Sequence, residues 1–83
     1  MTEIKGIRKK LGFSRHALAL ILDWELATVI RYEHGVLIKL KHDQQLEKIN
    51  SNPDFTYQLF AENRNELPPI EAKRIDDHFK ALR

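Results

Sequence analysis

The chain has 83 residues, with no cysteine, only three glycines and three prolines, and no long apolar run. Without cysteine it cannot form a disulfide, a zinc ribbon, an iron–sulfur cluster or a thiol nucleophile. Its stability therefore depends on packing or on oligomerisation. The longest apolar run, residues 17–22, is far too short to cross a bilayer. The charged segment 1–10 lacks the apolar core of a signal peptide, so we expect a cytoplasmic protein with no membrane partner.

Residue patterns of enzymes and metal sites are also missing. The chain has no phosphate-binding loop, nucleophile elbow or kinase signature. The neighbouring carboxylates Asp76 and Asp77 would point about 100° apart on a helix, so they cannot act as a catalytic pair. The histidines are scattered without a metal-binding spacing, and we expect each at the surface: His16, His34, His42 and His78. We therefore expect no enzymatic activity, no metal and no cofactor.

The charge balance is weakly basic and uneven. The chain holds 14 Lys and Arg against 12 Asp and Glu, a formal net charge of +2, and the basic excess lies in the first 50 residues. A basic N-terminal half fits a polyanionic partner such as nucleic acid. An ordinary solvated surface can carry the same balance, so charge alone leaves both interpretations open.

Apolar spacing and helix-end residues predict an all-α chain of five to six helices. Gly12 and Gly35 are expected to end helices, and Ser14 to cap the start of one. Asn52 followed by Pro53 predicts another helix start, with Asn52 as the cap. The expected inward-facing positions, helix by helix, are Ile4, Ile7 and Leu11; Leu18, Ile21 and Leu22; Trp24, Val29 and Tyr32; Leu40, Leu46 and Ile49; Phe55, Leu59 and Phe60; Ile75, Phe79 and Leu82.

The segment 7–35 carries a family pattern. Its features lie, without a gap, at Leu11-Gly12, Ser14-Arg15, Leu18-Ala19, Asp23-Trp24 and Arg31-Tyr32-Glu33-His34-Gly35. In this order and spacing the segment resembles the lambda-repressor-like Xre/Cro family of helix-turn-helix proteins. The resemblance covers about a third of the chain and implies a lambda-repressor-like helix-turn-helix bundle. In such a bundle the small Ala19 lets the second and third helices cross closely.

The resemblance also implies which residues meet DNA. The third helix would touch base edges with Leu26, Ala27, Thr28, Ile30 and Arg31. Phosphate contacts would come from Ser14 and Arg15 at the start of the second helix. Lys39 and Lys41, just past the third helix, either complete these phosphate contacts or are an ordinary solvated pair. In the family, the positions of Arg8 and Glu33 commonly form a structural ion pair. The implied function is a sequence-specific transcriptional regulator that binds double-stranded DNA.

Several positions depart from the family pattern. Asp23 replaces the usual turn glycine, Glu25 stands where a Ser or Thr cap is usual, and Arg15 replaces the more usual Gln. Leu26 and Ile30 place two branched apolar side chains on a face that is usually polar. Two interpretations follow: a sparse interface that reads thymine methyl groups, or a helix-turn-helix that serves as a scaffold for binding a protein.

The C-terminal part carries a second resemblance. The run 35–67, with His42-Asp43, Gln45-Leu46, Asn52-Pro53-Asp54-Phe55 and Asn63 to Leu67, is similar to the helical tail of HTH antitoxins of the MqsA-like and Panacea-associated kind. This similarity implies an alternative function, the antitoxin of a toxin–antitoxin pair, which binds DNA with one surface and a cognate toxin with another. The apolar residues of the region would complete the core or form a dimer interface.

We therefore expect one helix-turn-helix DNA-binding domain over residues 1–83, with a core at 3–50 and a C-terminal helical extension at 52–83. A monomer of this size would touch too little DNA for useful affinity, and family members usually bind two half-sites as dimers. The expected assembly is a homodimer on a palindromic operator.

Overall fold

Residues with a left-handed backbone conformation separate three short helices in the first part of the chain. The computed structural model describes residues 3–81, and its first helices are α1 (Ile4–Leu11), α2 (Arg15–Leu22) and α3 (Leu26–Glu33). Gly12 ends α1 at a φ of 78°, and Asp23 ends α2 at a φ of 60°. Aspartate adopts this conformation more readily than most residues with a Cβ, so Asp23 can stand in place of a turn glycine. The predicted cap of α2 is confirmed, because Ser14 Oγ accepts a hydrogen bond from the backbone N–H of Ala17 at 3.1 Å.

Gly12 is required by its surroundings as well as by its backbone. A Cβ at this position would lie 2.8 Å from Cγ of His78, closer than real side chains approach. The imidazole of His78 also donates through Nε2 to the carbonyl oxygen of Lys10 at 2.8 Å. This close approach holds the last helix of the chain against the end of α1.

Three further helices complete the described chain. They are α4 (Leu40–Ser51), α5 (Pro53–Asn63) and α6 (Pro69–Ala81), with one 3₁₀ turn, η1 (Arg64–Glu66), after α5. Every regular element within residues 3–81 is a helix, which confirms the all-α prediction. No helix in that range combines the length and the apolar character needed to cross a membrane.

The predicted start of α5 is confirmed, with Asn52 at the N-cap position and Pro53 as the first helical residue. The Asn52 side chain makes no capping hydrogen bond to α5; its Nδ2 donates instead to the carbonyl oxygen of Lys48 at 2.9 Å, at the end of α4. One local prediction in this region is wrong. Leu40, expected on the inner face of α4, is 73% exposed. It lies six residues before the buried Leu46, which places it about 120° around the helix from that face. The inner face continues from Leu46 to Ile49.

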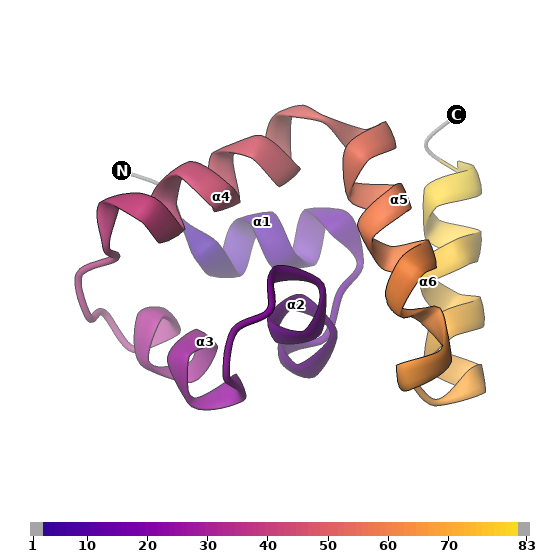
Figure 1. Ribbon diagram of the computed structural model, residues 1–83, viewed down its shortest axis with the longest axis horizontal. Coiled ribbons are helices and arrows are strands. Elements are labelled where there is room, and N and C mark those ends of the chain that lie inside the picture. Colours follow the sequence, from indigo (N-terminus) through magenta and orange to yellow (C-terminus); the bar gives the residue numbers. More distant parts are fainter. Residues whose placement is uncertain (1–2, 82–83) are drawn as a thin grey trace.

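The helices are arranged along one long axis. α4 packs along α1, and α2 packs against both α3 and α5. α5 and α6 lie side by side and antiparallel at one end of this axis (Figure 1). α3 and the loop 35–39 lie at the opposite end (Figure 1). We refer to these as the α6 end and the α3 end of the molecule.

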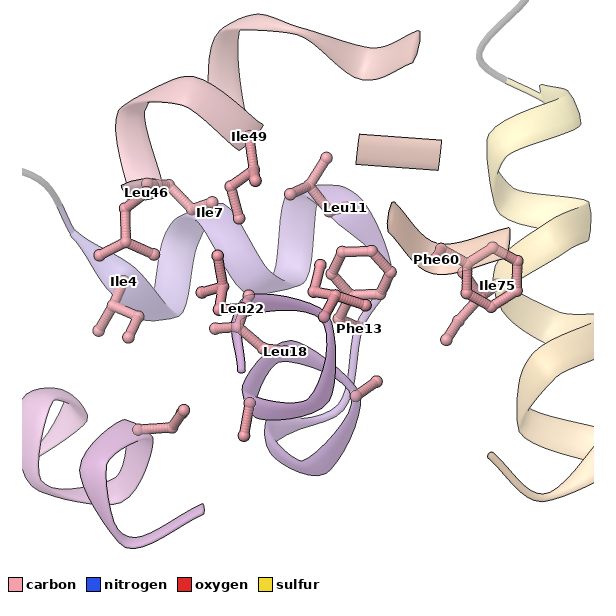
Figure 2. Packing of buried hydrophobic residues seen from close by; sticks show 14 of the residues in the cluster. Ile4, Ile7, Leu11, Phe13, Leu18, Leu22, Leu46, Ile49, Phe60 and Ile75 are labelled. Atoms are coloured by element: carbon pink, nitrogen blue, oxygen red, sulfur yellow. The ribbon is translucent and has the colours of Figure 1, made fainter. Parts of the chain in front are cut away.

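One apolar core joins the two ends. Leu46 and Ile49 of α4 point toward α1, and Leu18 and Leu22 of α2 lie on the other side of that helix (Figure 2). All four are buried, and Leu46 has no exposed surface. Because burial of such side chains contributes roughly 1.5–3 kcal/mol each, this packing fixes the position of α2 relative to α1 and α4.

The C-terminal helices share this core. The ring of Phe13, in the loop between α1 and α2, lies 5.9 Å from the ring of Phe79 in α6. Leu67, which was not among the expected core positions, is buried in the same cluster. Of the tail residues expected in a core or a dimer interface, three are buried in the core (Phe60, Ile75 and Phe79), two are partly buried against it (Phe55 and Leu59), and Leu82 lies outside the described residues. The extension is thus packed as part of the same folded unit.

Candidate nucleic-acid interface

Helix α3 has one buried and one exposed face. Val29 has no exposed surface and Tyr32 is 9% exposed, so these two residues attach the helix to the core. The other face carries the residues that the sequence analysis assigned to base contacts: Leu26, Ala27, Ile30 and Arg31 are exposed, and Thr28 at the edge is half-buried. The four exposed positions follow the spacing i, i+1, i+4 and i+5, which places them on one side of a helix. The structure therefore brings the five assigned residues to a single outward surface.

An aromatic cluster holds the inner face of α3. The rings of Trp24 and Tyr32 meet edge to face at 5.7 Å, and the ring of His42 in α4 lies 4.3 Å from that of Trp24. The Tyr32 hydroxyl lies 2.7 Å from Nδ1 of His42. Trp24 Nε1 donates to Oε1 of Gln45 at 3.2 Å. These contacts join α3 to α4 through side chains that are ten or more positions apart in the chain.

Two histidines that were expected at the surface are half-buried, namely His78 in α6 and, in this cluster, His42. Its side chain is half-buried in the aromatic cluster. Burial, together with the positive charges of Lys39 and Lys41, holds the pKa of His42 below its ordinary value of 6.5. A neutral ring with its proton on Nε2 can accept a hydrogen bond from the Tyr32 hydroxyl through Nδ1, whereas a protonated ring cannot. No spacing rule could identify this residue, because its partners come from two other segments.

The carboxylate of Glu33 is shared by two arginines. Nε of Arg8 lies 2.9 Å from Oε2 of Glu33, and Nε of Arg15 lies 3.1 Å from Oε1. The Glu33 side chain is only 3% exposed, and Arg8 is 13% exposed. Burial works against ionisation of Glu33, but the hydrogen bonds and charges of both arginines outweigh it, so its pKa lies below the ordinary 4.5. This ion pair ties the end of α3 to α1 and to the start of α2.

A carboxylate from α6, that of Glu71, lies at the start of α2. The hydroxyl of Ser14, which caps α2, also donates to Oε1 of Glu71 in α6. A helix N-terminus favours negative charge, so the Glu71 carboxylate stands beside the position predicted to meet a phosphate. Glu71 lies 57 residues from Ser14, and the sequence analysis gave it no role.

Exposed basic side chains lie in the elements that precede and follow α3 in the chain. Lys39 and Lys41 are exposed at the start of α4 and take part in no ion pair within residues 3–81. Arg15 is 49% exposed, and only its Nε bonds to Glu33. These positive groups can attract a polyanion, because exposed charges interact across about 10 Å at moderate salt.

Within residues 3–81 no group of three or more metal-ligating side chains comes together. No protein-family model, curated protein or solved structure matches the chain. The resemblance to Xre/Cro proteins therefore rests on the residues of the segment 7–35.

Proposed function

We propose that this protein is a sequence-specific DNA-binding regulator that uses α2, the turn at Asp23 and α3 as a lambda-repressor-like helix-turn-helix. The observation that carries the proposal is the outward surface of α3. This surface is exposed, while Val29 and Tyr32 on the opposite face of the helix are buried in the core. An α-helix presented in this way fits the width of the DNA major groove.

The side chains on this surface have the chemistry to read base edges. Arg31 can donate two parallel hydrogen bonds to a guanine. Leu26, Ala27 and Ile30 can contact thymine methyl groups, which explains apolar residues on a DNA-reading face. Phosphate contacts would come from Lys39, Lys41 and Arg15, whose two Nη atoms make no hydrogen bond to the described residues.

A second candidate is a protein-binding scaffold. Leu26 is 42% exposed and Ile30 is 38% exposed, and the two lie four residues apart on one face. Such a pair can also dock on an apolar groove of a partner protein. The basic flanks favour DNA, because an apolar docking face does not require Lys39 and Lys41 beside it.

We further propose that the protein binds DNA as a homodimer. A face about one short helix long contacts few base pairs, and two copies on half-sites related by a two-fold axis double the contact area. The expected operator is therefore palindromic.

Titration of labelled random-sequence duplex DNA at several salt concentrations tests the proposal. We expect the logarithm of the binding constant to fall steeply with the logarithm of salt, since neutralised phosphates release counterions. The Ile30→Asp variant should lose binding and remain folded, because Ile30 is not part of the core. Its matched control is Ile70→Asp, at a residue of α6 that is 86% exposed. Salt-independent or absent binding by the folded wild type would favour the protein-binding scaffold instead.

A further inference from the structure

Arg15 is an unusual residue for the start of a helix. It is the first residue of α2, where the backbone N–H groups without a helical partner favour negative charge. A positive side chain there opposes the helix dipole, so helix stability does not explain it. The Arg15 side chain is 49% exposed, and its Nε donates to Oε1 of Glu33 at 3.1 Å. Its partner is thus the last residue of α3, the helix with the proposed base-reading surface.

Contacts other than that with Arg15 fix the carboxylate of Glu33. Only 3% of the Glu33 side chain is exposed, and its Oε2 accepts a hydrogen bond from Nε of Arg8 at 2.9 Å. Nη1 of Arg8 donates to the carbonyl oxygen of Phe13 at 3.1 Å, so the guanidinium of Arg8 is fixed in turn. A long side chain loses rotamer freedom when its head group bonds to a fixed acceptor. The head group of Arg15 is therefore attached to α3.

The bond to Glu33 leaves part of the Arg15 guanidinium open. Within residues 3–81, neither Nη atom of Arg15 makes a hydrogen bond. A guanidinium can donate two parallel hydrogen bonds to a phosphate, so the open Nη groups suit that ligand. The hydroxyl of Ser14, the other residue of this helix start predicted to meet a phosphate, already donates to Glu71. Of these two predicted positions, Arg15 is therefore the one with side-chain donors that remain open.

We infer that Glu33 is a positioning residue for DNA binding, which holds the guanidinium of Arg15 so that its open Nη groups meet a DNA phosphate. This inference rests on the proposed function. Phosphate contacts set the register of a protein on the duplex. An arginine attached to α3 links that register to the helix that reads the bases, whereas an unattached arginine must first give up its rotamer freedom. Two arginines and one carboxylate also leave a net positive charge, which attracts the phosphate.

The Glu33→Gln variant separates this role from the structural role of Glu33. An amide has one acceptor oxygen in place of two. Arg8 is 13% exposed and thus more buried than Arg15, so we expect the oxygen to stay with Arg8. The NH₂ group then faces Nε of Arg15, and two donors cannot bond to each other. The variant keeps the tie between α1 and α3 and releases Arg15.

A double-mutant cycle on DNA affinity, measured by anisotropy titration of one duplex, tests the inference. With Arg15 present, Glu33→Gln should weaken binding about threefold, because the released arginine must be ordered again on DNA. In the Arg15→Ala background the same change removes only a negative charge, so binding should be equal or slightly tighter. A structural role alone would weaken binding in both backgrounds, and a charge effect alone would tighten it in both. Either result would overturn the inference.

Two further variants complete the cycle. Arg15→Lys keeps the charge but lacks a guanidinium that can bond to Glu33 and to a phosphate at once. It should lose most of the affinity that Arg15→Ala loses, and wild-type affinity in this variant would count against the positioning role. Asp76→Asn is the matched control, because Asp76 is also a carboxylate shared by two basic side chains, at the α6 end. It should leave the DNA affinity unchanged.

The inference and the proposed function fail in different ways. In the free protein, ¹⁵N relaxation of the Arg15 Nε–H group should show an ordered side chain in the wild type and a mobile one in Glu33→Gln. An ordered Arg15 in a protein that binds no DNA would overturn the proposed function, and the phosphate contact with it. A mobile Arg15 in a wild type that binds DNA would overturn the positioning role alone.

Discussion

The two ends of the molecule differ in their paired charges and in their exposed apolar side chains. At the α6 end, Asp76 accepts a hydrogen bond from the Tyr57 hydroxyl at 2.7 Å and pairs with Arg64 and Lys80. Only one large apolar side chain of α6 within the described chain is strongly exposed, Ile70. At the α3 end, five such side chains are exposed, namely Leu26, Ile30, Val36, Leu37 and Leu40.

This contrast fits a structural role for the α6 end and the proposed binding role for the α3 end. Charges that pair within the chain are satisfied without a partner, and they add little attraction for one. Basic groups without internal ion pairs, set beside exposed apolar side chains, are better explained by contact with another molecule. The α3 end has five exposed apolar side chains together with Lys39 and Lys41, whereas the α6 end, within the described residues, has the single combination of Ile70 and Lys73.

The largest expected effect comes from Glu33→Ala, which breaks the ion pair behind the α3 end. It leaves Arg8 partly buried without its partner, and we expect a loss of about 3 kcal/mol of unfolding free energy, measured by denaturant titration. Asp76→Ala at the α6 end should lower the unfolding free energy by less, because water can solvate the exposed Arg64 and Lys80 once their partner is removed. Equal losses would contradict the contrast between the ends.

Arg31→Ala should cost about 1–3 kcal/mol of binding free energy on a preferred DNA site and relax the preference at one base pair. Lys41→Ala should weaken binding to all DNA sequences alike and reduce the salt dependence of the binding constant. Arg64→Ala removes one positive charge at the α6 end and is the matched control. It should change neither the DNA affinity nor its salt dependence. These roles are checked by anisotropy titrations on matched and mismatched duplexes, and similar profiles for Arg31→Ala and Lys41→Ala would argue against them.

Glu71→Ala tests a contact between α6 and the start of α2, which is part of the proposed DNA surface. Removal of this carboxylate from the start of α2 frees Ser14 and reduces repulsion of phosphate, so we expect DNA affinity to rise about threefold. Glu62→Ala removes an exposed carboxylate of α5 and is the control. Unchanged affinity on loss of Glu71 would mean that phosphates do not approach the start of α2.

The smallest expected effect is a difference in acid sensitivity. The pKa of Glu33 is lowered in the folded state, so the stability it contributes is present above its ordinary value of 4.5 and is lost as the pH falls through the folded value. The gap in melting temperature between the wild type and Glu33→Gln should therefore narrow below pH 4.5. Parallel melting curves across that range would show that the carboxylate is not held ionised by its arginines.

Local signals in the sequence were enough to predict most of the helices. Gly12, Ser14 and Asp23 set the boundaries of α1 and α2 through their own backbone and hydroxyl chemistry. The two faces of α3 follow from its spacing. Asn52 and Pro53 marked the start of α5 correctly, but the hydrogen bond of the Asn52 side chain was not predictable, because the same amide can bond to the helix before it or to the helix after it.

Contacts between distant segments were not predictable from the sequence. Glu71 reaches Ser14, and His42 enters the ring cluster of Trp24 and Tyr32, only because packing of α4 and α6 brings them there. Neither residue stands in a spacing that distinguishes it from other surface positions. The exposed positions of α3, its buried residues Val29 and Tyr32, and the pair of Arg8 with Glu33 could be predicted from the sequence, whereas the contacts of His42 and Glu71 could not.

The central proposal, that the α3 end reads DNA, is tested most directly by selection from random duplex DNA at near-physiological salt. We expect enrichment of a palindrome whose half-sites lie about one helical turn apart, with a guanine in each half-site that tolerates substitution in the Arg31→Ala variant. A folded wild-type protein that enriches no sequence would contradict the proposal.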